Sequence, residues 1–117
     1  GLGPLDWSEG TPASMDGRRW TIVELRSRKE LYDEGVAMRH CVASYDHSCA
    51  AGGASIWSMC LERNHGRRRR VLTIEVSNRS KRICQIRGKV NRLPSEKELN
   101  VVRRWAVQQG LVLGELI

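Results

Sequence analysis

Phenylalanine is absent from the 117 residues, and tyrosine occurs only twice. The aromatic side chains for a core must therefore come largely from four tryptophans spread along the chain: Trp7, Trp20, Trp57 and Trp105. A hydrophobic content of 40% is enough for one modest core without a metal or a disulfide. We expect one compact domain over residues 20–117, after an irregular, Gly- and Pro-rich lead-in over residues 1–19.

Signals for metal binding, secretion and membrane insertion are also absent. The chain has no Cys-x-x-Cys pair, and its three histidines do not have the spacing of zinc ligands. It has no secretory signal, which favours reduced cysteines, and no apolar run near the roughly 18 residues that span a bilayer. We therefore expect a cytoplasmic protein without membrane contact, and we identify no metal site and no cofactor. Because the chain starts with Gly1 rather than Met, a processed chain or a part of a larger parent chain is expected.

Acidic residues are scarce between Arg63 and Arg92, where eleven Lys or Arg accompany a single acid, Glu75. The rest of the chain carries nine bases and twelve acids, so the net charge of +7 arises in this one region. A basic patch of this kind favours polyanions, of which nucleic acid is the commonest for a basic domain. A solvated face that only aids solubility is the alternative.

The periodicity of the sequence predicts an α+β fold. Alternating, β-branched stretches predict strands at residues 20–25, 55–62, 71–77 and 82–87, with a short edge strand at 111–113. Capping signals and apolar residues at helical spacing predict helices at residues 27–34, 38–51 and 95–109. The predicted fold class is an antiparallel β-meander of three to five strands, packed on one face by about three helices.

Alternation along the three central strands sorts their side chains into two faces. The apolar face, expected to pack on the helices, consists of Trp57, Met59, Leu61, Leu72, Ile74, Val76, Cys84 and Ile86. The opposite face is richer in hydrogen-bonding groups and consists of Ile56, Ser58, Cys60, Glu62, Val71, Thr73, Glu75, Ile83, Gln85 and Arg87. This second face predicts either a binding site or an ordinary solvent-facing surface.

The segment Met38–Val42 supplies the candidate for chemistry, His40. If the helix that carries His40 and Cys41 lies over the polar face, it meets a set of candidate substrate- and phosphate-binding residues. These residues are Ser58, Thr73, Gln85, Arg87, Asn91, Arg92, Arg67, Arg68, Arg69 and Arg70. Arg87 could fork onto a phosphate, and Gly88 would let a ligand or backbone approach closely.

His40 and Glu75 are the candidate catalytic residues. His40 is either a general acid or base or a capping histidine. Glu75 is either a general base or the cross-strand ion-pair partner of Arg87, and the ion pair is favoured because such pairs are common. Cys41 is expected to be buried, as most free cysteines are.

These residues together resemble the PcfJ-like family of conjugative and other mobile elements. The resemblance rests on Glu34-Gly35, Met38–Val42, Ser44-Tyr45, Ile56 and Ser58, Leu72–Glu75, Gln85–Gly88, Asn91-Arg92 and Trp105, in that order. It covers residues 20–108 and implies an association with DNA transfer or phage, without implying a reaction.

The function favoured by the sequence is a nucleic-acid- or nucleotide-binding domain of a mobile-element protein, from a conjugation system or a phage. One alternative is a nucleotide-processing enzyme that uses the same polar cleft, either a metal-independent nuclease or a nucleotidyl- or ADP-ribosyl-type transferase. A second alternative is a protein-interaction module that docks on a transfer-machinery partner through the helix at residues 99–107.

Overall fold

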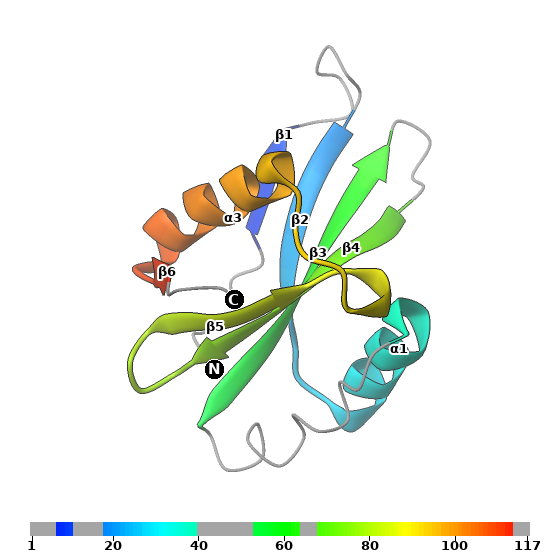
Figure 1. The fold of residues 1–117 in the computed structure, drawn as a ribbon, viewed down its shortest axis with the longest axis horizontal. Helices are drawn as coiled ribbons and strands as arrows, with labels where there is room; N and C mark the ends of the chain where they lie inside the picture. The colour runs from blue at the N-terminus through cyan, green and yellow to red at the C-terminus, as the bar shows by residue number, and fades with distance from the viewer. Residues whose placement is uncertain (1–6, 11–17, 40–52, 64–67, 114–117) are drawn as a thin grey trace.

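A six-stranded sheet forms the centre of the computed structural model, which describes residues 7–10, 18–39, 53–63 and 68–113 (Figure 1). The strands lie in the sheet in chain order. They are β1 (Trp7–Gly10), β2 (Arg18–Leu25), β3 (Ala54–Arg63), β4 (Arg68–Ser77), β5 (Arg82–Arg87) and β6 (Val112–Leu113). The described residues also form the α-helices α1 (Arg28–Met38) and α3 (Glu96–Gln109) and a short 3-10 helix, η2 (Lys89–Asn91).

The sheet is mixed rather than a pure antiparallel meander. Strands β1 to β5 pair antiparallel with their neighbours, but β6 pairs parallel with β5, because α3 carries the chain back across the sheet between them. The fold prediction is therefore wrong in its details: the sheet has six strands, and two α-helices rather than about three lie in the described part of the chain. The helix expected at residues 38–51 falls outside the described residues beyond Arg39.

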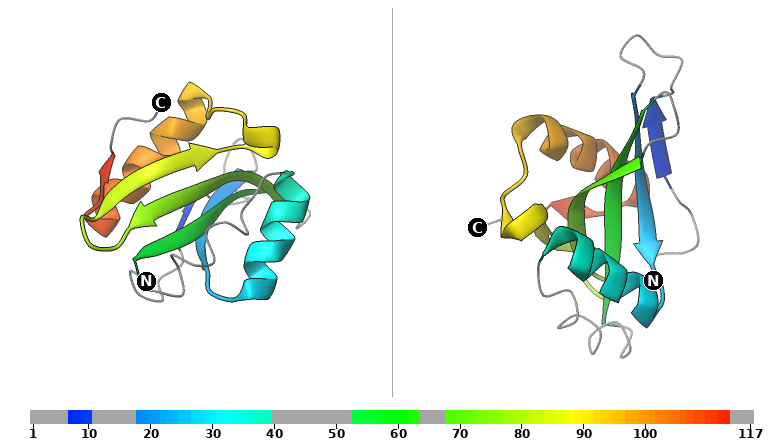
Figure 2. Two further views of the ribbon diagram at one scale, coloured as in Figure 1. Left: turned by 60° about the horizontal axis from the view of Figure 1, so that its bottom comes forward. Right: turned by 90° about the vertical axis from the view of Figure 1, so that its right-hand side faces the viewer.

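The two helices lie on opposite faces of the sheet, so the prediction that all helices pack on one face is also wrong (Figure 2). Trp57 on β3 packs against Trp105 of α3, whereas the next residue, Ser58, hydrogen-bonds to Glu34 of α1. Successive side chains of a strand point to opposite faces, so these two contacts place the helices on different sides. Hydrophobic periodicity identifies a helix but not the face that it covers.

The boundaries of α3 agree with the predicted helix at residues 95–109. The Ser95 hydroxyl accepts a hydrogen bond from the Glu98 backbone N–H at 3.2 Å, and the Glu98 carboxylate accepts one from the Ser95 N–H at 2.9 Å. This capping box satisfies two N–H groups that have no partner within the helix. At the other end, Gly110 adopts a left-handed conformation with φ of 70°, which glycine tolerates without a steric cost.

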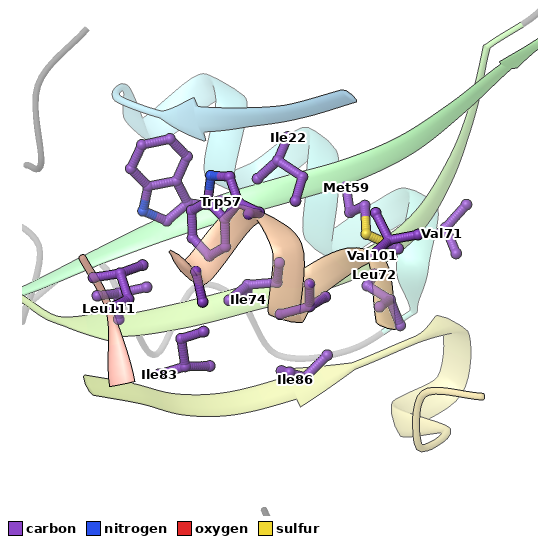
Figure 3. Close-up of a cluster of buried hydrophobic side chains, with 14 of the residues drawn as sticks. Ile22, Trp57, Met59, Val71, Leu72, Ile74, Ile83, Ile86, Val101 and Leu111 are labelled. Atoms are coloured by element: carbon purple, nitrogen blue, oxygen red, sulfur yellow. The ribbon is translucent and has the colours of Figure 1, made fainter. Parts of the chain in front are cut away.

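The main core lies between the sheet and α3 (Figure 3). The rings of Trp57 and Trp105 meet edge to face, with centroids 5.2 Å apart and planes at 62°. Most of the predicted apolar face joins them, and α3 contributes its own buried side chains, Val101, Val102, Trp105 and Ala106. The helix face expected to dock on a partner is therefore occupied by the core of the domain.

Two β-bulges change which face several side chains occupy. The register between β3 and β4 shifts after Met59, which leaves Val71 as an extra residue, and the register between β4 and β5 shifts near Cys84. As a result Val71 and Ile83, both expected on the polar face, are buried in the main core, whereas Cys84, expected in the core, is exposed. One extra residue reverses the alternation of a strand, and a strict period of two cannot reveal it.

Two segments near the N-terminus also depart from expectation. Strand β1 lies in the stretch of residues 1–19 expected to be irregular, where it pairs with β2. Helix α1 starts after Ser27, whose hydroxyl accepts the Glu30 N–H, but it does not stop at Gly35 as predicted. It continues to Met38 and ends at Arg39, which adopts a left-handed conformation. Strand pairing and helix packing supply the stability that the local sequence does not predict.

Trp105→Ala is expected to lower the free energy of unfolding by about 3–5 kcal/mol, because it leaves a cavity in the main core against Trp57. Val107→Ala, on the same helix but 82% exposed, is the control and should change it by less than about 0.5 kcal/mol. Urea unfolding followed by circular dichroism measures both. Equal effects of the two substitutions would contradict this account of the core.

A candidate binding site beneath helix α1

Helix α1 buries a carboxylate against the sheet. Leu31, Glu34 and Met38 lie three and four residues apart, so they share one face of the helix, and all three are buried. Glu34 is 0% exposed. An isolated buried charge would cost several kcal/mol, so the carboxylate must be matched by donors from the sheet.

The sheet supplies three donors to Glu34. The Ser58 hydroxyl and the Arg70 Nε each donate to Oε1 at 2.9 Å, and the Thr73 hydroxyl donates to Oε2 at 2.6 Å. Ser58 and Thr73 lie directly opposite each other on β3 and β4. These contacts tie the helix to two neighbouring strands and fix the position of the Arg70 guanidinium.

A pocket of about 330 Å³ opens beside this network. Its wall is formed by β2, α1, β3 and β4, through the residues Val23, Leu25, Glu30, Asp33, Glu34, Ser58, Cys60, Arg68 and Arg70. The Cys60 thiol lies within 3.7 Å of the Ser58 hydroxyl and is buried. The pocket therefore combines an apolar side, an acidic side on the helix and a basic side on β4.

Of the predicted binding residues, Ser58, Thr73 and Arg70 are brought together around Glu34. Arg68 lines the same pocket, and Arg69, the next residue, is exposed on β4. Ser58 and Thr73 are 15 residues apart in the sequence, and only the pairing of β3 with β4 makes them neighbours. His40 and Arg67 fall outside the described residues.

Gln85 and Arg87 lie on the next strand and extend the same face. The register places Gln85 opposite Glu75, and Arg87 opposite Thr73. Arg87 is half-buried, and its Nη1 donates to the Ile86 carbonyl at 2.9 Å. The polar face predicted from alternation is therefore real around Ser58, Thr73, Gln85 and Arg87, but α1 covers part of it.

Glu75 stands apart from the carboxylate network. It is half-buried, and burial raises the pKa of its carboxyl above the ordinary value of 4.5. Its directly opposite neighbours are Ile56 and Gln85, and the ion pair with Arg87 that we favoured from the sequence is not found among the described residues. Desolvation by burial is therefore the cause of its raised pKa.

The segment after β5 is organised by Arg92. Its guanidinium donates two hydrogen bonds to the Glu98 carboxylate, each 2.9 Å long. Burial alone would raise the pKa of Glu98, but hydrogen bonds from Arg92 and Ser95 and the charge of Arg92 hold that pKa below its ordinary value. A Cβ on Gly88 would lie 2.6 Å from Arg92 Cγ. Gly88 therefore admits the Arg92 side chain, rather than the ligand expected from the sequence.

Asn91, another predicted binding residue, is exposed in η2 beside Val90. Both have a positive φ, 60° for Asn91 and 57° for Val90. Asparagine tolerates this region, but a β-branched valine rarely adopts it, so the turn is strained. Helix η2 contacts α1, which makes the turn part of the surroundings of the site.

Glu34 is the central residue that sequence reasoning missed as a functional candidate. The sequence marks Glu34 only as the predicted end of a helix and as part of the Glu34-Gly35 resemblance. One signal was available: Glu34 is an acid at helical spacing between Leu31 and Met38, on the apolar side of an amphipathic pattern. An acid at such a position needs buried partners, and Ser58, Thr73 and Arg70 provide them.

The fold and the site define a small domain in which two helices sandwich a mixed sheet and one of them delivers a buried carboxylate to it. The family model described as PcfJ-like protein matches residues 10–102, and the chain belongs to this family. Membership associates the chain with mobile genetic elements. No curated protein gives a significant match, and neither does any solved structure.

Neither a membrane-spanning helix nor a cluster of metal ligands is found in the described part of the chain. None of the helices there is long and apolar enough to cross a membrane. No group of three or more His, Cys, Asp or Glu side chains that could hold a metal ion is found among the described residues.

Glu34→Ala is expected to lower the free energy of unfolding by about 2–4 kcal/mol, since it strands the buried hydroxyls of Ser58 and Thr73. Glu96→Ala is the matched control: Glu96 also pairs with an arginine, but it is exposed, so its loss should cost less than about 0.5 kcal/mol. Urea unfolding compares the two. A Glu34→Ala protein as stable as Glu96→Ala would show that the network does not hold α1.

Glu75→Gln is expected to raise the free energy of unfolding at pH 7. The pKa of Glu75 is raised in the folded state, so the protonated carboxyl favours folding over the ionised one. The contribution of Glu75 to stability is therefore complete below the unfolded pKa and is lost as the pH rises through the folded pKa. The ionised carboxylate therefore opposes folding at neutral pH, and the gain from glutamine should shrink below pH 4.5. Urea unfolding between pH 4 and pH 7 measures it. A gain that grows as the pH falls has the wrong sign.

Proposed function

We propose that this domain binds nucleic acid, and that the arginines at the start of β4 contact its phosphates. Arg68, Arg69 and Arg70 are exposed and are the first three residues of β4. Within the described part of the chain, neither Arg68 nor Arg69 forms an ion pair. No acidic side chain there neutralises their charges. Arg68 and Arg69, two adjacent exposed arginines without an ion pair in the described part of the chain, are the observation that carries the proposal.

Further cations flank the arginine cluster. Strand β5 runs antiparallel to β4, and its last residue, Arg87, lies opposite Thr73 in the middle of β4. The chain continues into η2, where Lys89 is exposed, and η2 contacts α1. A phosphate backbone that follows β4 past α1 would meet positive charge on both strands. The association of the family with mobile elements supports a nucleic-acid partner.

Substituting Arg68 and Arg69 together by Ser is expected to weaken binding of single-stranded or duplex DNA. Each lost phosphate contact should reduce the slope of log affinity against log salt by about 1. Fluorescence anisotropy between 25 and 200 mM salt measures both affinity and slope. The matched control is Arg79→Ser with Arg82→Ser, which removes the same charge from exposed positions at the opposite end of β4.

Two results would overturn the proposal. One is no binding of DNA or RNA by the wild-type protein even at 25 mM salt. The other is an equal loss of affinity in the two double variants, because that would trace binding to net charge and not to the start of β4.

An enzyme that processes nucleotides is a second candidate, supported by the raised pKa of Glu75. A carboxyl whose pKa is raised by burial is suited to general acid or base work, and Glu75 lies beside Gln85 on the polar face. Labelled nucleic acids and nucleotide cofactors would be incubated with the wild type, His40→Ala and Glu75→Gln. Turnover that is lost in Glu75→Gln supports the enzyme, and unchanged substrates with the wild type reject it.

A further inference from the structure

The charged groups that line the pocket beneath α1 differ in how many of their hydrogen-bonding atoms already have partners within the fold. On its acidic side, Glu30 accepts a hydrogen bond from the Arg26 N–H at 2.9 Å, and Asp33 pairs with Lys29 at 3.1 Å. Glu34 accepts all three of its donors from the sheet. Each carboxylate of the pocket therefore already has a partner within the fold.

The basic side of the pocket is different. Arg70 uses its Nε for Glu34, and the side chain remains 42% exposed. Its two Nη groups make no hydrogen bond within the described part of the chain, and Arg68 beside the pocket has no ion pair there. The donors still available in this pocket are therefore guanidinium N–H groups, which bind oxyanions in a planar, forked geometry.

Glu34 prepares Arg70 for such an anion. A flexible arginine loses side-chain entropy when it binds, and a partner that holds it beforehand reduces that cost. The bond from Nε to a fully buried carboxylate restrains the guanidinium and leaves its two Nη groups without a hydrogen bond to Glu34. The hydroxyls of Ser58 and Thr73, on β3 and β4, donate to the same carboxylate and hold it in place.

The size and remaining wall of the pocket favour one nucleotide. A volume of about 330 Å³ lies at the small end of the range for small-molecule sites, which excludes a duplex. Val23 and Leu25 give the wall from β2 an apolar character suited to a base or sugar. A terminal phosphomonoester offers three free oxygens to the two arginines, whereas a phosphodiester inside a strand offers two.

We propose that this pocket binds the phosphomonoester of a nucleotide, at the end of a nucleic-acid strand or in a free mononucleotide. Arg70 and Arg68 bind the phosphate, and Glu34 is a positioning residue that acts through Arg70. This inference deepens the proposed function and rests on it for the class of ligand. It adds recognition of a strand end to the contacts along the backbone.

The test compares single-stranded oligonucleotides of one sequence by fluorescence anisotropy. They carry a 5′-phosphate, a 3′-phosphate or hydroxyls at both ends, and a closed circle of the same sequence has no end. At least one of the two phosphorylated oligonucleotides should bind about tenfold tighter than the oligonucleotide with hydroxyls at both ends. The affinity of the circle should be close to that of the hydroxyl form. A 5′- or 3′-mononucleotide that competes only with the phosphorylated strand identifies the monoester itself as the ligand. Competition by the mononucleotide without any strand-end preference would assign the pocket to free nucleotides.

Substitutions locate the preference. Arg70→Gln and Arg68→Gln should each reduce the ratio of phosphorylated to hydroxyl affinity several-fold, and Arg79→Ser, at the far end of β4, should leave the ratio unchanged. Within the described part of the chain Arg68 forms no hydrogen bond or ion pair, so its variant keeps the test valid if Arg70→Gln fails to fold. Glu34→Gln should lower the ratio while binding of the circle is retained, which a general loss of structure would not produce.

The outcomes separate the two proposals. If the circle binds but neither end phosphate raises the affinity and no mononucleotide competes, the phosphomonoester site is wrong and the proposed function stands. If a phosphorylated end or mononucleotide binds but the circle does not bind even at low salt, the site stands and backbone binding is wrong. If the ratio of phosphorylated to hydroxyl affinity is unchanged in both Arg68→Gln and Arg70→Gln, the strand end is recognised at another part of the protein. That result overturns the assignment of this pocket.

Discussion

The carboxylate of Glu34 is the constraint on which the α1 side of the structure depends. A charge that is 0% exposed is tolerated only when donors surround it, and here they come from β3 and β4 at once. The helix cannot slide or rotate on the sheet without leaving the carboxylate unpaired. The same requirement brings Arg70 to the edge of the pocket, so a single desolvated charge links the packing of α1 to the electrostatics of the site.

The two faces of the sheet use different physical principles. The face toward α3 is held by hydrophobic burial and by the edge-to-face contact of Trp57 with Trp105, which tolerate some repacking. The face toward α1 has a small apolar contact around Leu31 and Ile56 and relies on directional hydrogen bonds. Directional bonds specify one arrangement of polar groups, which is what a binding surface needs. The division explains why the polar candidates gather on one side of the domain.

Arg92 shows how the fold uses some of the basic residues for itself. Arg92 and Arg70 both pair with glutamates, yet their surroundings differ. Arg92 places both ends of its guanidinium on Glu98 and covers Gly88, so its donors are committed to joining η2 to α3. Arg70 donates only its Nε–H to Glu34, and its two Nη groups make no hydrogen bond within the described part of the chain. The basic region between Arg63 and Arg92 is therefore not one uniform surface, and charge counts alone overstate its capacity for a ligand.

Local patterns in the sequence determined a large part of this protein. Alternation located β2 to β5, the capping box at Ser95 located α3, and the resemblance that names the PcfJ-like family agrees with its match over residues 10–102. These features depend on neighbours within about four residues or one strand, which is the range over which periodicity and capping act. Ser58, Thr73 and Arg70 could also be chosen as polar candidates in this way.

Only the tertiary structure decided how these pieces combine. The bulges that bury Val71 and Ile83, the parallel pairing of β6, and the placement of α1 opposite α3 all follow from packing between residues distant in the chain. The role of Glu34 belongs to the same class, because its three donors lie 24 to 39 residues away. A glutamate in a helix is ordinarily a surface residue, and although the spacing of Glu34 between Leu31 and Met38 indicates burial, it does not identify the donors on the strands that match its charge.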